Sequence, residues 1–241
     1  MGLERILQAN SVAVIGASKV ETKRGFQAIR TLRDEGYEGQ VYPVNPKESE
    51  ILGLACYPSV GDIPHPVDLA LITTPARTVP GILEQCAAKG IAGAVLIAGG
   101  FGEAGEQGQA LQGQIADIAR RTGVRLIGPN TSGMMNVHKH LNLVGLPDVP
   151  AGDLALLSQS GNMALALITE ARMETRKGLS YYVGVGNEAD LHFHEHLAFL
   201  RDDPDTAAVI CYVEGMHDGR SFLAEAAVTT RIKPVVLLKS G

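Results

Sequence analysis

The first residues that could do chemistry follow an apolar run near the N-terminus, where a glycine turn could hold a phosphate. Val12–Ile15 leads into Gly16, Ala17 and Ser18, and an amphipathic stretch begins at Arg24, directly after Lys23. A helix N-terminus offers free N–H groups and the positive end of the helix dipole, and a glycine lets the backbone approach a ligand. The pattern departs from G-x-G-x-x-G, because Ser18 replaces the second glycine and the next one is Gly25, so a plain turn also fits it.

The end of the next β-rich run distinguishes between nucleotide classes. A NAD site needs an acidic residue there to hold the ribose 2′-hydroxyl, but the chain has Asn45 and Lys47 after Val44. A lysine suits a ribose that carries a phosphate, as both NADP and CoA do. This position therefore disfavours NAD and leaves NADP and CoA open.

Three closely spaced histidines, His192, His194 and His196, raise the question of a metal site. On a helix His192 and His196 would share one face at i, i+4 and could supply two ligands. The intervening glutamate is wrongly placed for H-E-x-x-H and no third ligand is evident, so we interpret the segment as a solvated helical face without a metal. His138 and His140 are interpreted as surface residues of a connection.

Short β-rich apolar runs alternate with longer amphipathic stretches, and these elements must position the residues above. The alternation predicts βαβ units with right-handed connections and a parallel sheet covered by helices on both faces. A segment with Pro and Gly, Gly145–Gly152, interrupts the pattern, so we expect two α/β domains over residues 1–145 and 146–241. The expected strands are Val12–Ile15, Gln40–Val44, Asp68–Ile72, Gly93–Ile97, Val124–Ile127, Leu154–Leu157, Ser180–Val183, Ala207–Val213 and Val235–Leu238; the expected helices are Arg24–Asp34, Val79–Lys89, Glu106–Arg121, one from Asn162, Leu191–Arg201 and Arg220–Thr230.

Composition limits the class of protein. The 241 residues are 45% hydrophobic and 20% charged, which is ordinary for a globular protein. The net charge of −5 gives no reason to expect nucleic acid as a partner, and the apolar runs are far shorter than the ~20 residues of a membrane helix. The N-terminus lacks a secretory pattern and the three cysteines lack C-x-x-C spacing, so we expect a cytoplasmic enzyme.

Taken together and in order, several motifs resemble the nucleoside-diphosphate-forming acyl-CoA synthetases, which include succinyl-CoA synthetase α subunits and ADP-forming acetyl-CoA synthetases. The resemblance implies a Rossmann-type CoA-binding domain followed by a flavodoxin-like ligase domain. The family reaction is carboxylic acid + CoA + nucleoside triphosphate ⇌ acyl-CoA + nucleoside diphosphate + phosphate, through an acyl phosphate and a phosphohistidine. The motifs, which cover essentially the whole chain, are 14–18 (VIGAS), 42–47 (YPVNPK), 72–75 (ITTP), 99–103 (GGFGE), 128–133 (GPNTSG), 157–161 (LSQSG), 186–190 (GNEAD) and 212–215 (YVEG).

For the first domain, the resemblance implies a CoA site at the carboxyl ends of the strands. Thr131 stands where family members often have Cys, and a rigid domain-joining turn is the alternative for the loop around it. The residues expected to hold the CoA nucleotide are Gly16, Ala17, Ser18, Lys23, Arg24, Asn45 and Lys47, with Thr73 and Pro75 shaping the wall; those near the thiol and acyl end are Gly128, Pro129, Asn130 and Gly133.

For the second domain, the resemblance implies a phosphoryl site. Ser158, Ser160 and Gly161 would cradle the phosphoryl group at a helix start, and Glu214 would act as the catalytic residue that hydrogen-bonds the phosphorylated histidine. The alternatives are a serine N-cap without a ligand and a solvated glutamate at a strand end.

The family's phosphohistidine follows the strand that matches Val235–Leu238, and none of the seven histidines has that place before Gly241. We therefore expect an incomplete second domain, in a fragment or a natural short form, and no complete activity from this chain alone. The resemblance implies CoA and a carboxylic acid or acyl-CoA as small-molecule partners. It implies that Mg-nucleotide binds only to a partner, an ATP-grasp β subunit or fused domain, with a homodimer as a further option.

Two other functions stay open at this point. A non-catalytic, regulatory CoA- or acyl-CoA-binding module fits the missing histidine. An NADP-dependent oxidoreductase ranks last, because neither a hydride-transfer acid nor a catalytic Tyr/Lys pair is recognisable.

Overall fold

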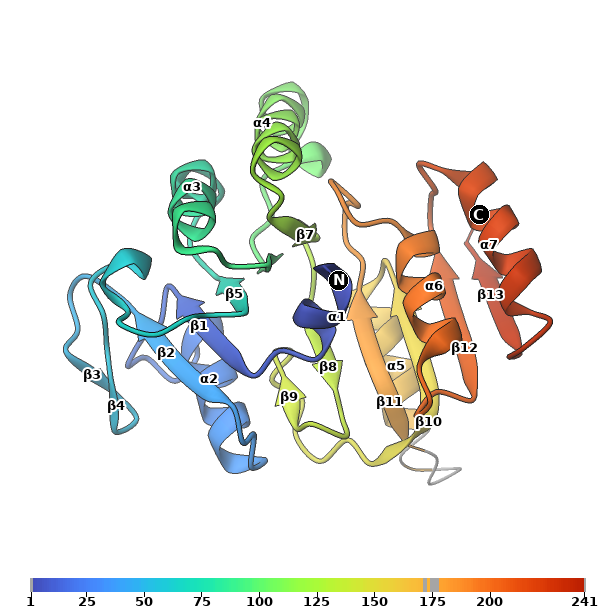
Figure 1. Cartoon of the computed structure of the whole chain (residues 1–241), viewed down its shortest axis with the longest axis horizontal. Coiled ribbons are helices and arrows are strands. Elements are labelled where there is room, and N and C mark those ends of the chain that lie inside the picture. The colour runs from blue at the N-terminus through green and yellow to red at the C-terminus, as the bar shows by residue number, and fades with distance from the viewer. Residues whose placement is uncertain (1, 171–172, 174–177, 241) are drawn as a thin grey trace.

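The first of the two larger sheets in the described part of the chain is a parallel one in its N-terminal half (Figure 1). The computed structural model describes residues 2–170, 173 and 178–240. Its first sheet has the order β2-β1-β5-β6-β7, so the chain leaves β1 toward one edge and then returns to add strands on the other side. Such a reversal opens a ligand crevice at the carboxyl ends of β1 and β5. The strands are β1 (Ser11–Ile15), β2 (Gln40–Val44), β5 (Leu69–Ile72), β6 (Gly93–Leu96) and β7 (Arg125–Ile127).

Alternation along β1 assigns its side chains to two separate cores. Val12 and Val14 face the side covered by α2, whereas Ala13 and Ile15 face the side covered by α3 and α4. Successive side chains of a strand point to opposite faces, so an uninterrupted apolar run is buried on both. The predicted α/β class is confirmed here, with helices α2 (Arg24–Asp34), α3 (Val79–Lys89) and α4 (Glu106–Thr122).

The second sheet has the order β13-β12-β10-β11-β8-β9, with its four longer strands parallel. Helices α6 and α7 pack on one face of it and α5 on the other. This arrangement confirms the second α/β domain. Its elements are β10 (Ala151–Ser158), α5 (Gly161–Glu170), β11 (Leu179–Gly184), α6 (Phe193–Asp202), β12 (Ala208–Val213), α7 (Gly219–Thr229) and β13 (Val235–Lys239).

Two short strands that we did not predict, β8 (Met134–Asn136) and β9 (Leu141–Asn142), extend the second sheet. Both are antiparallel to their neighbours and lie before the expected boundary at residue 145. The polypeptide thus crosses to the second sheet directly after β7, and the division at 145/146 stays a prediction. Also unpredicted are α1 (Gly2–Leu7), the hairpin β3 (Glu50–Ile51) and β4 (Leu54–Ala55), and the 3-10 turns η1 (Val60–Asp62), η2 (Ala76–Thr78) and η3 (Gly102–Ala104).

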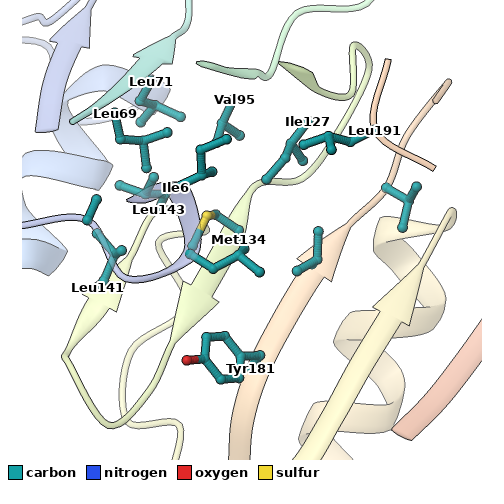
Figure 2. Close-up of a cluster of buried hydrophobic side chains, with 14 of the residues drawn as sticks. Ile6, Leu69, Leu71, Val95, Ile127, Met134, Leu141, Leu143, Tyr181 and Leu191 are labelled. Atoms are coloured by element: carbon teal, nitrogen blue, oxygen red, sulfur yellow. The ribbon is translucent and has the colours of Figure 1, made fainter. Parts of the chain in front are cut away.

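A shared apolar core joins the two sheets. Figure 2 shows Ile6 of α1 among side chains of the first sheet, such as Val95, with Met134 of β8 and Tyr181 of β11 nearby. All four side chains are buried. Because one continuous core spans both sheets, the carboxyl ends of their strands keep a defined relation to each other.

At the far edge, β13 and α7 expose apolar side chains, including Leu223 (69% exposed) and Val236 (52% exposed). Within the described residues, no helix combines the length and the apolar character needed to cross a bilayer.

The interpretation of the histidine segment as a solvated helical face is wrong for His196. His196 is fully buried on α6, and His192 precedes the helix as its N-cap residue. Burial lowers the pKa of His196 to about 4. The sequence pattern predicted a helix here, but which of its faces packs against the sheet depends on the tertiary structure.

Candidate functional site

The turn after β1 requires glycine at two places. Gly16 has φ +88°, and a Cβ there would lie 2.6 Å from Thr73 Oγ1. A Cβ at Gly25 would lie 2.4 Å from the carbonyl oxygen of Gly16. Gly25 thus permits the close approach of helix and strand that the third glycine of a dinucleotide fingerprint permits.

Several of the predicted CoA residues build this turn themselves. The N–H groups of Gly16 and Ala17 donate to Val44 O at 3.1 and 3.3 Å. The Thr73 hydroxyl donates to Ile15 O at 3.0 Å, and Asn45 Nδ2 donates to Ala17 O at 2.6 Å. These groups hold the turn in shape, so the donors for a phosphate have to come from elsewhere.

The start of α2 supplies such donors. Within the described part of the chain, no side chain caps this helix at Lys23. The N–H groups of its first turn therefore remain available to a ligand. Lys23 and Lys47 are both exposed beside the turn. Ser18 also lies at the turn, where its hydroxyl accepts the N–H of Val20 at 3.0 Å.

Arg24 does not join this group. Its guanidinium donates to Ser132 O and Val144 O, both at 2.7 Å, and burial lowers its pKa. The side chain leaves the helix toward the segment between the two sheets. A contact between Arg24 and CoA therefore stays a prediction, which would require the guanidinium to leave these two carbonyl groups.

The loop after β7 belongs to both domains. Asn187 N donates to Pro129 O at 2.9 Å, and Ala189 N donates to Gly128 O at 3.0 Å. Gly128 has φ +97° and Gly133 has φ +116°, conformations that favour glycine. The loop therefore joins the two domains, as the alternative interpretation of this segment expected. It also places Asn130 at the surface.

Asn130 reaches a cleft of about 590 Å³ between the domains. The predicted residues Asn130 and Glu214 meet there, since the carboxyl ends of β7 and β12 face the same space. The side chains that matter most among its lining are Glu103, Asn130, Gln159, Asn187, Glu214 and His217. Of these, Glu103, Gln159, Asn187 and His217 were not predicted, although three of them lie inside motifs quoted for the resemblance.

Glu103 is held by the loop that carries it. Its carboxylate accepts the N–H groups of Gly100 at 2.5 Å and Phe101 at 3.2 Å, and Asn187 Nδ2 at 2.5 Å. Burial raises the pKa of Glu103, but the hydrogen bonds from Asn187 and the backbone outweigh it and leave the pKa below its usual value. The described lining residues include two glutamates, Glu103 and Glu214, and one histidine, His217, but no lysine or arginine.

At the start of α5, the serine hydroxyls serve the backbone. Ser158 is fully buried and donates to Ser160 O at 2.8 Å, and Ser160 Oγ accepts the N–H of Met163 at 3.3 Å. Ser160 thus acts as a helix N-cap, as the alternative interpretation expected. A Cβ at Gly161 would lie 3.2 Å from Ser132 Cβ. A phosphoryl group would therefore meet backbone N–H groups here rather than free hydroxyls.

Comparison with known proteins finds a match to a different family in each half of the chain. Residues 10–137 match the CoA binding domain family, and residues 151–241 match the succinyl-CoA ligase like flavodoxin domain. The chain is 43% identical to the ADP-forming acetate–CoA ligase I subunit alpha of Pyrococcus furiosus, over 100% of this chain and 53% of that protein. It is 43% identical to the ADP-forming acetate–CoA ligase I of Archaeoglobus fulgidus, over 99% of this chain and 35% of that protein.

A solved structure is similar throughout. The acetyl-coenzyme A synthetase 1 of Ca. Korarchaeum cryptofilum, in complex with phosphate and ADP, matches with a TM-score of 0.95 at 38% identity, over 99% of this chain and 52% of that chain. The chain spans about half the length of this protein and of the P. furiosus subunit. These matches confirm the resemblance to nucleoside-diphosphate-forming acyl-CoA synthetases. The chain belongs to the CoA binding domain family through residues 10–137. Residues 151–241 form the succinyl-CoA ligase like flavodoxin domain, and the whole chain matches the α part of the ADP-forming acid–CoA ligases.

Proposed function

We propose that this chain is the CoA-binding α part of a ligase with the reaction carboxylic acid + CoA + ATP ⇌ acyl-CoA + ADP + phosphate. The observation that carries the proposal is the cleft between the domains, to which the first contributes Asn130 and the second contributes Glu214. The two acetate–CoA ligases described above are both ADP-forming.

In this proposal the nucleotide end of CoA binds at the first turn of α2. The helix N–H groups face its phosphates, and Lys23 and Lys47 add positive charge. Gly16 and Thr73 shape the turn, as their contacts support. The thiol end then extends past Pro75, along the carboxyl ends of the strands, to the loop that bears Asn130.

The acid substrate is proposed to be a monocarboxylate. Glu103 and Glu214 line the cleft, and the described lining residues include no lysine or arginine. A second carboxylate on the substrate would lie near both glutamates, and these lining residues offer it no lysine or arginine as a partner. A short neutral group, such as the methyl group of acetate, meets no such penalty.

Glu214 is the proposed catalytic residue. A carboxylate that accepts the N–H of an imidazole fixes the tautomer and direction of the ring, which favours phosphoryl transfer at the other nitrogen. The phosphoryl group would bind at the backbone N–H groups that begin α5, next to Ser160 and Gly161. The acid's carboxylate would take the phosphoryl group from the histidine nitrogen and form the acyl phosphate. The thiol of CoA would then lose its proton and attack the acyl carbon, and the C–O bond to phosphate would break as phosphate leaves.

Mg-nucleotide is proposed to bind to an ATP-grasp β subunit or fused domain. The subunit of P. furiosus and the longer A. fulgidus ligase support either arrangement. A homodimer is a second prediction for the assembly, which light scattering measures. A cytoplasmic location also stays a prediction, supported by three free cysteines, all of them buried.

Calorimetric titration with CoA, dephospho-CoA and NADP tests the proposal. We expect micromolar affinity for CoA and no ADP formation by this chain alone, because the nucleotide site lies in the partner. Tighter binding of NADP than of CoA would overturn the assignment. Tight CoA binding by a complete protein that never forms ADP would favour the regulatory module instead.

A further inference from the structure

Gln159 connects the ends of three neighbouring strands in the wall of the cleft. It follows β10, which lies between β11 and β12. Its Oε1 accepts the N–H groups of Glu214 at 2.6 Å and Gly215 at 3.0 Å, directly after β12. Its Nε2 donates to Glu188 Oε2 at 3.0 Å, in the loop after β11. Both ends of the carboxamide are therefore engaged.

The partners fix the orientation of this carboxamide. Two backbone N–H groups can only be met by its oxygen, which leaves its NH₂ group to donate to Glu188 Oε2. Neither partner tolerates the flipped amide. Gln159 thus has one arrangement that satisfies all of its hydrogen bonds.

Glu188 provides a rigid anchor for this arrangement. Its side chain is fully buried, and its backbone has φ 51°, an uncommon conformation for a residue other than glycine. Its Oε1 accepts the N–H of Phe193 at 3.2 Å, the first residue of α6, and lies 3.5 Å from His192 Nδ1. The positive end of the α6 dipole further favours the carboxylate.

The Glu214 side chain itself is exposed toward the cleft, so its direction depends on how its backbone is held. Gln159 holds the N–H of Glu214, and Lys239 Nζ donates to its carbonyl oxygen at 3.0 Å. We infer that Gln159 is a positioning residue, which fixes the backbone of Glu214 from the buried Glu188 and so aims the Glu214 carboxylate into the cleft. This inference rests on the proposed function, in which Glu214 is the catalytic residue.

Amide hydrogen exchange in the present chain tests the geometric part. Gln159→Met keeps the length of the side chain and removes its hydrogen bonds. We expect exchange of the Glu214 and Gly215 amides to rise about tenfold or more, with CoA affinity unchanged. Gln40→Met, at the exposed first residue of β2, is the matched control and leaves both amides protected. Unchanged exchange at both amides in Gln159→Met would overturn the inference.

Kinetics of the complete ligase, with its phosphohistidine segment and ATP-grasp part, test the functional part. Gln159→Met should lower kcat about 100-fold, the effect of a misplacement of about 1 Å, while KM for CoA stays within about twofold. Gln159→Glu should lower kcat similarly, because its new carboxylate would face the carboxylate of Glu188. Adding Glu188→Gln to Gln159→Glu restores every hydrogen bond between the two side chains. The double variant should have a kcat at least about tenfold above that of Gln159→Glu, which a general loss of packing would not allow.

The two failures are distinguishable. An active wild type beside a Gln159→Met enzyme of equal kcat, or a double variant no better than Gln159→Glu, overturns the positioning role alone. A complete wild-type enzyme without acid-dependent ADP formation overturns the proposed function and with it the positioning of a catalytic Glu214 by Gln159.

Discussion

Arg24 and Ser132 are joined by a hydrogen bond of 2.7 Å from the guanidinium to the backbone carbonyl. Arg24 is the first residue of α2, and Ser132 packs against Gly161, the first residue of α5. The two helix starts proposed to hold the CoA phosphates and the phosphoryl group are thus braced against one loop.

The brace predicts a stability effect at Arg24. Arg24→Met leaves the carbonyl groups of Ser132 and Val144 without their donor, so the free energy of unfolding should fall by about 2–3 kcal/mol. Arg24→Lys, which can restore one of the two bonds, should lose roughly half as much. Urea unfolding measures both.

Arg33→Met is the control for this change, because Arg33 lies on the same helix in an exposed pair with Asp34. It should change stability by less than about 1 kcal/mol. A normal stability of Arg24→Met combined with a tenfold loss of CoA affinity would show that Arg24 contacts the ligand after all.

Lys47→Ala should weaken CoA binding by roughly 1–2 kcal/mol if the exposed ammonium group meets the 3′-phosphate. The same substitution should matter much less for dephospho-CoA, which lacks that phosphate. Calorimetry with both ligands makes the comparison. An equal loss for the two would place Lys47 at another part of CoA.

Gly25→Ala should destabilise the protein by about 1–3 kcal/mol and abolish CoA binding at micromolar concentrations. Its Cβ would lie 2.4 Å from the Gly16 carbonyl oxygen and 2.9 Å from the Ala17 Cα, and these backbone atoms leave no room for it. Gly113→Ala, in α4 with open space around the new Cβ, should instead stabilise by up to about 1 kcal/mol. Thermal unfolding compares the two, and a stable, CoA-binding Gly25→Ala would refute the close approach of α2 to this turn.

His196 predicts how stability depends on pH. Its pKa is lowered to about 4 by burial, from 6.5 in the unfolded chain, so the unfolded state binds the extra proton between these values. The free energy of unfolding should therefore fall as the pH drops from about 6.5 to about 4, with His196 accounting for about 2 kcal/mol at pH 5.

His196→Leu should remove this part of the pH dependence. It should not cost stability at pH 7, because neither ring nitrogen has a hydrogen-bond partner within the described structure. Urea unfolding at pH 7 and pH 5 gives the comparison. An unchanged difference between the two pH values in the variant would assign the effect to another group.

The sequence by itself determined the elements whose pattern is long and regular. Helices Arg24–Asp34 and Val79–Lys89 have the predicted bounds, because an amphipathic stretch is encoded in the spacing of its own residues, and Gly90 ends the second in a left-handed C-cap. The sequence also predicted the buried strand β1, because its residues form a short continuous apolar run that ends at a glycine. Local spacing also indicated that residues at the ends of parallel strands would share one edge of each sheet.

Tertiary structure decided what depends on partners distant in the chain. The short strands β8 and β9 carry too few residues to show a period, and they form by pairing, β8 with the edge of β11 and β9 with β8. Arg24 looked like a phosphate ligand from its place at a helix start, but the carbonyl groups that bind it lie far along the chain. Gln159 was not predicted as a site residue, because its hydrogen bonds form only when β11 and β12 place Glu188 and Glu214 on either side of it. A side chain's direction is set by the groups that satisfy it, and sequence spacing does not record where folding brings those groups.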